Sequence, residues 1–446
     1  MSERLQSLAV VFLLRARHLR QRIVNIYRSF RTADGRVRLR LSLYERIPHV
    51  VTHGASLYRQ TFGRRARVVA VVGSFGKTTT ARALLAALGL DDSRHTGSNS
   101  GTGLADALLR ISPHAKHAVI EAAITDKGQM EGHARLLKPN VAVVTSIGSE
   151  HMTSLGSLEI TRAEKAKMVS AIPASGFVVL NGDDPNVLWM RELSQARVIT
   201  YGFGESNHVR ATDVVENELS GIRFKLHIDG GVYDIRTRLI GRHMVYPILA
   251  AATVAYEEGY DLRQAIAALE QLEPTHNRLQ PIQLPGLGAW VLLDAYKAAL
   301  ETIEAALDAL SKLSAKRRIV ILGPVEEPPG SQGPIYKALG VRLAEIADSV
   351  VFVGGKKAFN SLRAGAISAG ASRDALMNMR TDPHAIARTL ENMGLRAGDI
   401  ILIKGRSTQH LERVALILAG RTVTCVADYC LRRHDCATCP LLREKI

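Results

Sequence analysis

The residues best suited to chemistry form a short segment, GSFGKTT, at positions 73–79. An apolar run at 67–72 precedes it and a helical pattern at 79–90 follows it, which is the setting of a phosphate-binding loop. Small residues in such a loop expose backbone N–H groups to phosphate, and the N-terminus of the helix favours negative charge. We therefore expect a nucleoside triphosphate here, with Lys77 near its outer phosphates and the Thr78 hydroxyl on Mg²⁺. The residues expected to contact the nucleotide are Gly73, Ser74, Gly76, Lys77, Thr78 and Thr79.

The match to the general phosphate-loop pattern GxxxxGK[ST] is incomplete. Its first glycine would fall on Val71, and Gly73 comes two residues later. A plain glycine turn before a helix is the alternative interpretation of this segment. The GKT triplet between a strand and a helix favours phosphate binding over that alternative.

The elements around this segment predict a mostly parallel α/β fold, because strand patterns alternate with helical patterns. Strands of the first unit are expected at 67–72, 118–121, 141–145, 178–180 and 198–201, with helices at 79–90, 103–110, 157–171 and 247–258. Residues 208–240 carry turn signals typical of an antiparallel hairpin. A second unit is expected to have strands at 290–293, 318–322, 350–353 and 400–403, with helices at 298–313, 335–346 and 383–394.

The chain is predicted to have four regions. They are a basic helical N-terminal segment (1–60), a central ATP-binding P-loop domain (61–273), a smaller Rossmann-like C-terminal α/β domain (274–420) and a Cys-rich tail (421–446).

Several motifs follow one another in the order in which the Mur ligases carry them. GSFGKTTT (73–80) resembles the phosphate loop of that family, especially in the branch that adds D-alanyl-D-alanine to a muramyl tripeptide. TGSNSGTG (96–103) stands where those enzymes have an Asn-rich loop, which implies that Asn99 contacts the nucleotide. TSIGSEH (145–151) is similar to the family's TNIGxxH. The resemblance covers roughly residues 67–410.

The resemblance implies a magnesium centre beside the phosphate loop. Glu121, at the end of an expected strand, matches the glutamate that binds the catalytic Mg²⁺, and His151 matches a second metal ligand. Lys165 matches by position the lysine that the family carbamylates to hold the second Mg²⁺. Phosphoryl transfer to a carboxylate gathers negative charges, so metal ions and Lys77 are needed there. Taken alone, His151 would be an ordinary loop histidine and Lys165 a solvated helix lysine. By resemblance, the catalytic residues are Lys77, Lys165 and His151, and the Mg²⁺ ligands are Thr78, Glu121, His151 and Lys165.

The C-terminal unit also resembles the family. HNRL at 276–279 resembles a segment whose arginine, here Arg278, approaches the nucleotide. LLDAY at 292–296 resembles DDSYNANP, which implies that Asp294 contacts the ribose or a phosphate-linked group. For both side chains the ordinary alternative is a charge on a surface loop. GRHMVYP at 241–247 lacks both asparagines of the family's GxHNxxN, so the preference for adenine stays open.

All four cysteines lie between positions 425 and 439. Their spacing, CxxxxC followed by CxxC, suits a tetrahedral thiolate site for Zn²⁺, with an iron–sulfur cluster or unliganded thiols as alternatives. The expected ligands are Cys425, Cys430, Cys436 and Cys439, with His434 as a spare candidate. The absence of cysteine elsewhere disfavours a secreted disulfide scaffold and favours the cytoplasm.

Positive charge is concentrated at the N-terminus. Residues 1–67 contain fifteen Arg, no Lys and three acidic residues, which is most of the net charge of +16. A near-neutral body disfavours nucleic acid as a partner. Apolar residues at helical spacing between Leu5 and Phe30 predict a helix that either packs on the domain behind it or lies on an anionic membrane surface or acidic partner. The apolar run at 8–14 is too short to span a bilayer.

The sequence therefore predicts an ATP-dependent carboxylate–amine ligase that forms an amide bond through an acyl-phosphate, with ATP and Mg²⁺ as cofactors and small or peptide-like substrates. Only about 70 residues precede the phosphate loop, so no UDP-sugar-binding domain is expected there. A nucleotide-binding subunit without catalysis is the rival hypothesis, favoured by the altered segment at 241–247. Retention of Glu121, His151 and Lys165 favours the enzyme. An ATPase without amide chemistry is a second alternative.

Overall fold

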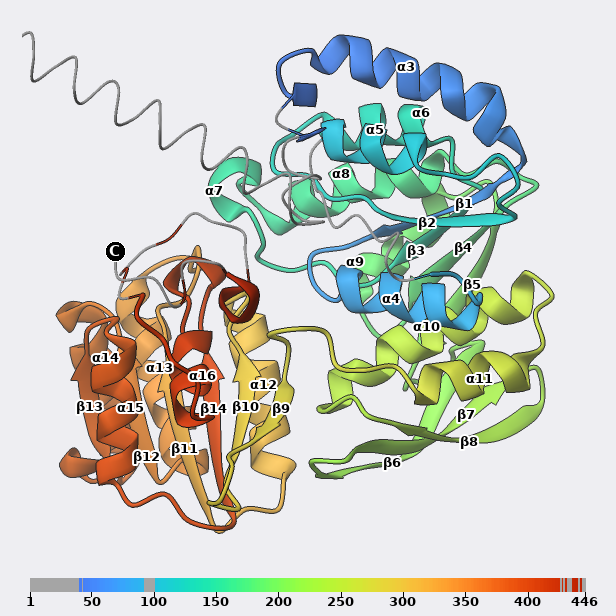
Figure 1. Ribbon diagram of the computed structural model, residues 1–446. Helices are drawn as coiled ribbons and strands as arrows, with labels where there is room; N and C mark the ends of the chain where they lie inside the picture. Colours follow the sequence, from blue (N-terminus) through green and yellow to red (C-terminus); the bar gives the residue numbers. More distant parts are fainter. Residues whose placement is uncertain are drawn as a thin grey trace, which may run out of the picture.

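The computed structural model describes residues 40, 41, 43–91, 101–425, 427, 430, 435–439 and 442, which form two α/β units joined near residue 274 (Figure 1). The expected nucleotide contact Asn99, the spare ligand His434 and most of the Arg-rich segment lie outside the described residues. Among the described helices, none combines the length and the apolar character that crossing a bilayer requires.

A sheet of eight strands forms the centre of the first unit. Its spatial order is β2-β1-β3-β4-β5-β6-β7-β8, with parallel pairs from β2 across to β6 and antiparallel pairs from β6 to β8. A parallel sheet covered on both faces needs apolar strands, and RVVAVV in β1 meets that need. The strands are β1 (Arg67–Val72), β2 (His117–Glu121), β3 (Val141–Val144), β4 (Phe177–Asn181), β5 (Arg197–Gly202), β6 (Val209–Glu218), β7 (Gly221–Ile228) and β8 (Gly231–Thr237).

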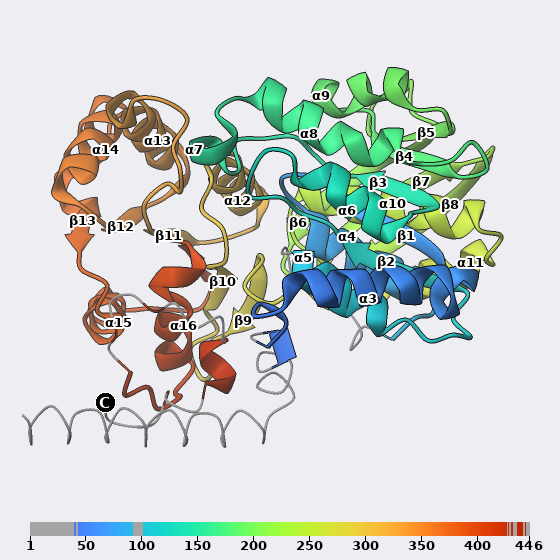
Figure 2. The same cartoon turned by 90° about the horizontal axis from the view of Figure 1, so that it is seen from above.

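Helices cover both faces of this sheet, as Figures 1 and 2 show. Val69 and Val71 of β1 face the layer of α4 (Lys77–Ala87), α10 (Val245–Glu257) and α11 (Leu262–Glu270). The alternate residues of β1 face the other layer, because successive side chains of a strand point to opposite faces. That layer contains α5 (Gly101–Leu109), α6 (Gln129–Leu137) and α8 (Leu158–Ser170), with α3 (Pro48–Gln60) packed outside α5 and α6. The short elements are η1 (Phe62–Arg65), α7 (Met152–Leu155), α9 (Pro185–Leu188), η3 (Trp189–Leu193) and η4 (Arg242–Met244).

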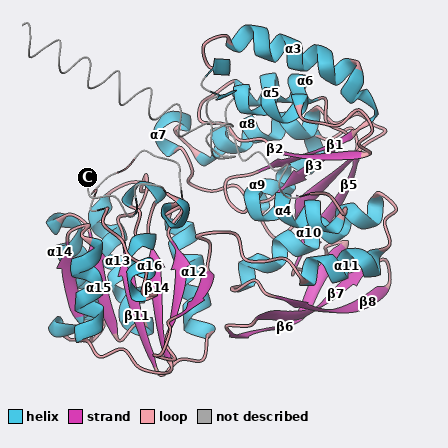
Figure 3. Ribbon diagram, viewed as in Figure 1, coloured by secondary structure: helices cyan, strands magenta, loops and turns pink. Residues whose placement is uncertain are grey.

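The second unit is a six-stranded sheet in the order β13-β12-β11-β14-β10-β9, parallel except for the β9–β10 pair (Figure 3). Its strands are β9 (Gln280–Gln283), β10 (Trp290–Asp294), β11 (Arg317–Leu322), β12 (Ser349–Val353), β13 (Leu376–Met379) and β14 (Asp399–Lys404). One apolar layer contains α12 (Leu300–Lys312), α13 (Gln332–Ile346) and α14 (Lys356–Ser368), and the other contains α15 (Pro383–Asn392) and α16 (Glu412–Leu418). The short helices are η5 (Arg373–Ala375), η6 (Ser407–Gln409) and η7 (Cys436–Thr438).

The register of β1, β2 and β3 brings three loops to one edge of the central sheet. Val71 pairs with Glu121, and Val72 pairs with Val144. Glu121 therefore ends β2 beside the phosphate loop, and the segment after β3 begins next to Gly73. Ligands of open α/β sheets bind at this edge, outside the carboxyl ends of the strands.

The predicted α/β class with two mostly parallel sheets is confirmed. Residues 208–240 differ from the expectation, because they form three antiparallel strands that extend the central sheet, where a hairpin was predicted. Strand β13 was not predicted, because LMNM is short, half-exposed and lacks strict alternation.

Candidate functional site

The phosphate loop joins β1 to α4, and its backbone requires glycine at two positions. Gly73 has a φ of +145°, and a Cβ there would lie 1.9 Å from Thr145 Oγ1. Gly76 has a φ of +82° and caps α4, which begins at Lys77. Because a side chain at positive φ is strained, these two positions explain the glycines of GSFG.

The phosphate loop is held against the segment after β3, residues 145–148. The N–H of Ser74 donates to the carbonyl of Ser146 at 2.7 Å, and the N–H of Phe75 donates to Ser146 Oγ at 3.1 Å. Thr145 Oγ1 donates to the carbonyl of Phe75 at 2.6 Å. The motifs GSFGKTT and TSIGSEH therefore form one continuous structure.

Two buried lysines donate hydrogen bonds to the phosphate loop. Lys77 Nζ donates to the carbonyls of Gly73 and Ser74, both at 2.8 Å. Lys165 Nζ, from α8, donates to the carbonyl of Gly73 at 2.6 Å and to Ser74 Oγ at 3.2 Å. Exposed fractions of 5% for Lys77 and 1% for Lys165 mean that each ammonium needs an anionic partner.

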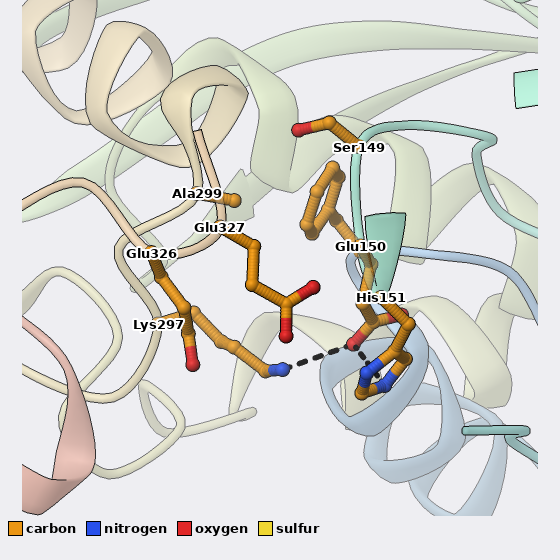
Figure 4. A pocket seen from close by; sticks show the side chains of 8 residues that line it. Ser149, Glu150, His151, Lys297, Ala299, Glu326 and Glu327 are labelled. Atoms are coloured by element: carbon orange, nitrogen blue, oxygen red, sulfur yellow. Dashed lines mark ion pairs between the residues drawn. The ribbon is translucent and has the colours of Figure 1, made fainter. Parts of the chain in front are cut away.

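The shared partner is Glu150. Its Oε2 lies 3.2 Å from Lys77 Nζ and 3.6 Å from Lys165 Nζ. Its Oε1 lies 3.0 Å from Nζ of Lys297, which comes from the C-terminal unit (Figure 4). Burial by itself would raise the pKa of Glu150, but the three ammonium groups lower it well below its usual value. Glu150 is therefore an anion that compensates three cations.

Lys165 carries an unusual amine. Burial and then repulsion by Lys77 lower the pKa of Lys165 to about 7, although Glu150 acts in the opposite direction. The neutral, nucleophilic amine is therefore more accessible near neutral pH than it is for an ordinary lysine.

Thr78 and Glu121 form a corner of oxygen atoms. Thr78 Oγ1 donates to Glu121 Oε2 at 3.0 Å and accepts from Arg278 Nη2 at 3.1 Å. Hydroxyl and carboxylate oxygens are the ligands that Mg²⁺ prefers. His151 lies elsewhere, with its Nε2 3.8 Å from Glu150 Oε1. Among the described side chains, Glu121 and His151 do not share a cluster of three or more potential metal ligands.

A pocket lies between the two units, next to Glu150, and is partly open to solvent; its empty space of about 260 Å³ includes some of that solvent. Figure 4 shows side chains from both units around it. Its lining is Phe75, Ser149, Glu150, His151, Lys297, Ala299, Glu326 and Glu327. Glu301 joins the units there, because it accepts from the N–H and Oγ of Ser149 at 2.7 and 2.6 Å. Glu327 Oε2 is buried and has no hydrogen-bond partner in the described structure, as expected of a pocket that receives a polar ligand.

Three of the predicted nucleotide contacts, Thr79, Asp294 and Arg278, make contacts within the protein. Thr79 is 2% exposed, and its Oγ1 lies 3.1 Å from Thr275 Oγ1 in the connector between the units. Asp294, at the end of β10, accepts from Lys404 Nζ at 2.7 Å. Arg278 reaches Thr78 and also stacks over the ring of Tyr296, 4.6 Å from its centroid.

Sequence reasoning missed two residues of this site. Glu150 stands next to His151 in TSIGSEH, so a carboxylate just after an expected strand was an available signal. Lys297 lies in the segment after β10, and only its contact with Glu150 in the folded chain shows that it belongs to the site.

The four tail cysteines are free thiols, and their sulfur atoms do not form one cluster among the described residues. Cys436 is buried, with its Sγ 3.2 Å from His410 Nδ1. Cys425 Sγ lies 3.6 Å from Arg413 Nη1. The four-cysteine set is thus not assembled here, and zinc binding stays a prediction.

A phosphate loop on a parallel sheet, with buried lysines under it and a second α/β unit against it, defines a nucleotide-dependent enzyme of the phosphoryl-transfer class. The sequence matches the Mur ligase middle domain over residues 71–255 and the Mur ligase glutamate ligase domain over residues 277–407.

Two relatives carry the name UDP-N-acetylmuramoyl-tripeptide–D-alanyl-D-alanine ligase. The Mycobacterium tuberculosis (strain H37Rv) protein is 31% identical over 367 residues, which cover 78% of this chain and 72% of that protein. The Bacillus subtilis protein is 28% identical over 369 residues, which cover 81% and 77%.

Solved structures share the fold. MurF from Acinetobacter baumannii has a TM-score of 0.72 at 23% identity, covering 83% of this chain and 80% of that one. MurF from Thermotoga maritima, in complex with ADP, has a TM-score of 0.72 at 20% identity, covering 83% of each. The chain belongs to the Mur ligase family and is an ATP-dependent ligase that forms amide bonds. The ligase hypothesis is thus supported over the non-catalytic subunit and the simple ATPase.

Replacing Glu150 by Gln should destabilise the ligand-free protein. We expect Glu150→Gln to lower the free energy of unfolding by roughly 3–5 kcal/mol, because breaking a buried ion pair leaves uncompensated charge. Urea unfolding measures the change, and Glu205→Gln in an exposed turn is the control, with an expected change within about 0.5 kcal/mol.

The pH dependence of that difference follows from the lowered pKa. Folding lowers the pKa of Glu150 from 4.5, so its contribution to stability is complete above about pH 4.5 and is lost as the pH falls below that value. The difference in the free energy of unfolding between wild type and Glu150→Gln should therefore become smaller as the pH falls below about 4.5. Equal stability of Glu150→Gln and wild type at pH 7 would contradict the role assigned to Glu150.

Proposed function

We propose that this ligase joins a peptide-like carboxylate to an amino acid or a short peptide in the cavity between the two units, with D-alanyl-D-alanine as the first amine to test. The observation that carries the proposal is the set of three lysines around buried Glu150 at the cavity wall. The name shared by the mycobacterial and Bacillus relatives supports this choice of amine.

The reaction has two steps. A carboxylate oxygen attacks the γ-phosphorus of ATP, the bond to the bridging oxygen breaks, and ADP leaves. The amine nitrogen then attacks the acyl carbon and loses a proton, while inorganic phosphate leaves with the electron pair of the broken C–O bond. The first step brings anionic oxygens together, and the second develops negative charge on the acyl oxygen beside the phosphate, so positive charge fixed beforehand lowers both barriers.

The lysines supply that charge from two sides. Lys77 lies under the loop, where its Nζ can exchange Glu150 for phosphate oxygens. Lys297 belongs to the C-terminal unit, so the cavity receives its charge only when the two units are close. Arg278 adds a guanidinium at Thr78. Closure of the C-terminal unit thus completes the cationic environment of the transferred phosphoryl group.

The residues present fit Mg²⁺. Thr78 and Glu121 offer hydroxyl and carboxylate oxygens 3.0 Å apart, which suits a hard divalent cation. We assign them to one ion, and assign His151 and a carbamate on Lys165 to a second. When bound, Mg²⁺ would neutralise phosphate charge and polarise the reacting phosphoryl group.

Replacing Lys77 should abolish turnover. We expect Lys77→Ala to lower kcat/KM by at least about 100-fold, since the transition state loses a fixed cation. Phosphate release is measured with Mg²⁺-ATP, pooled carboxylates and pooled amines that include D-alanyl-D-alanine, with mass spectrometry for new amides. Lys116→Ala, an exposed lysine, is the control. Phosphate release by wild type that needs no acceptor, or that persists in Lys77→Ala, would contradict the proposal.

Lys165 should form a carbamate. Its neutral amine attacks the carbon of CO₂, a C–N bond forms, and one proton passes from the nitrogen to solvent; a pKa of about 7 favours this reaction at neutral pH. We expect one ¹³C carbamate resonance in protein equilibrated with ¹³C-bicarbonate, absent in Lys165→Ala and kept in Lys167→Ala, two residues along the same helix. A spectrum without that resonance, or with an unchanged one in Lys165→Ala, would rule the carbamate out.

The N-terminal region is assigned to an anionic surface. Its arginines form the most basic part of the chain, and the described part nearby exposes Val50 and Leu57 on α3 and Phe62 just beyond it, with exposed fractions of 67%, 59% and 64%. A helix with exposed apolar residues on one face and basic residues on its polar face is typical of binding to anionic lipid. We expect the full chain to sediment with anionic liposomes and a chain lacking residues 1–60 to stay in solution. Equal sedimentation of the two would remove this assignment.

A further inference from the structure

A second cluster of chemically active side chains lies in the C-terminal unit, away from the phosphate loop. His410 follows η6, Glu412 begins α16, and Cys436 begins η7 in the tail. All three are buried, and one potential ligand atom from each lies within 4.8 Å of the others. Among the described residues, this is the one group in which three such side chains converge.

The geometry centres on one ring nitrogen. His410 Nδ1 lies 2.8 Å from Glu412 Oε1 and 3.2 Å from Cys436 Sγ. The other ring nitrogen, Nε2, lies 3.1 Å from the carbonyl of Cys430 and can only donate to it. In the neutral ring Nδ1 then presents its lone pair to the carboxylate and the sulfur. A backbone carbonyl that fixes the far ring nitrogen is the usual outer contact of a metal-binding histidine.

An ion pair between a protonated His410 and Glu412 is the simpler explanation, and it accounts for only part of the cluster. Burial would lower the pKa of His410, yet the contact with Glu412 raises it overall. That pair uses Glu412 Oε1. The second oxygen, Oε2, is buried, with 4% of the residue exposed, and no N–H or O–H group of the described residues donates to it; the Cys436 thiol is the polar group beside this carboxylate. A buried carboxylate oxygen without an N–H or O–H donor is costly, so it points to a missing cation.

We propose that His410, Glu412 and Cys436 bind a zinc ion that fastens the tail to the C-terminal unit. Nitrogen, oxygen and sulfur donors together suit Zn²⁺ better than the hard cations Mg²⁺ and Ca²⁺. On binding, the Cys436 thiol loses its proton to solvent, and the thiolate and the carboxylate balance the charge of the ion. These three ligands take the place of the predicted four cysteines. Cys425 is not among them, because Arg413 Nη1 donates to its carbonyl at 3.0 Å and lies 3.6 Å from its sulfur.

The proposed zinc site would attach the short tail to the C-terminal unit. Among the described residues of the tail, three form a small buried apolar cluster, Val423, Cys436 and Leu442. Next to Cys436, Asp435 lies 2.9 Å from Nε2 of His276 in the connector between the units. A zinc ion at Cys436 therefore also stabilises the contact between Asp435 of the tail and His276 of the connector. His276 lies two residues before Arg278.

The test measures metal content and needs no substrate, so its result is independent of the proposed reaction. Full-length protein is loaded with Zn²⁺, desalted and analysed by native mass spectrometry and elemental analysis. We expect one tightly held ion per chain, lost in Cys436→Ser and in Glu412→Gln. Cys425→Ser and Cys430→Ser are the matched controls and should keep the ion, since Cys430 contributes only its backbone carbonyl.

Cobalt substitution checks the donor atoms. We expect Co²⁺ bound to wild type to show a thiolate-to-cobalt absorption band that disappears in Cys436→Ser and stays in Cys425→Ser. Circular dichroism and ATP binding of Cys436→Ser establish that the variant is folded. Wild type that retains no zinc would overturn the proposal, and so would loss of zinc in Cys425→Ser and Cys430→Ser, which would restore the four-cysteine site.

Discussion

One buried carboxylate holds the centre of this ligase together. Glu150 faces Lys77, Lys165 and Lys297, each from a different segment, and without it their positive charges would repel one another. Buried charges persist only when they are paired, so the loop after β3, the phosphate loop, α8 and the C-terminal unit must all arrive in register around this residue. The glycines of the phosphate loop serve the same requirement, because a Cβ at Gly73 would force apart the two loops that Glu150 and Lys77 connect.

The contact between the two units depends on the same point. Lys297 and Glu301 both reach the loop after β3, the first through Glu150 and the second through Ser149. Lys297 thereby adds a positive charge to the shared wall. The pocket forms where the two units meet, and neither unit contains it alone.

The sequence predicted the parts of the molecule that local pattern determines. Strands such as β1 and β3 are apolar along most of their length, because helices cover both faces of the sheet. The GKT triplet predicts the phosphate loop. Glu121 was predicted from the resemblance to the Mur ligases, and the structure places it at the end of β2, next to the phosphate loop. Local pattern could not reveal Glu150 as a hub, because its partners come from distant segments. The same holds for the cluster of His410, Glu412 and Cys436, where reasoning from cysteine spacing alone chose different ligands.

The acceptors of Lys77 affect which anions can bind near the phosphate loop. In the ligand-free chain its Nζ is already satisfied by two carbonyls and Glu150. A singly charged anion that displaces Glu150 exchanges one ionic contact for another and gains little. A polyphosphate reaches several cations and the loop amides together, so only it gains substantially from the exchange. If ATP binds at this loop as proposed, Glu150 therefore favours a triphosphate over singly charged anions.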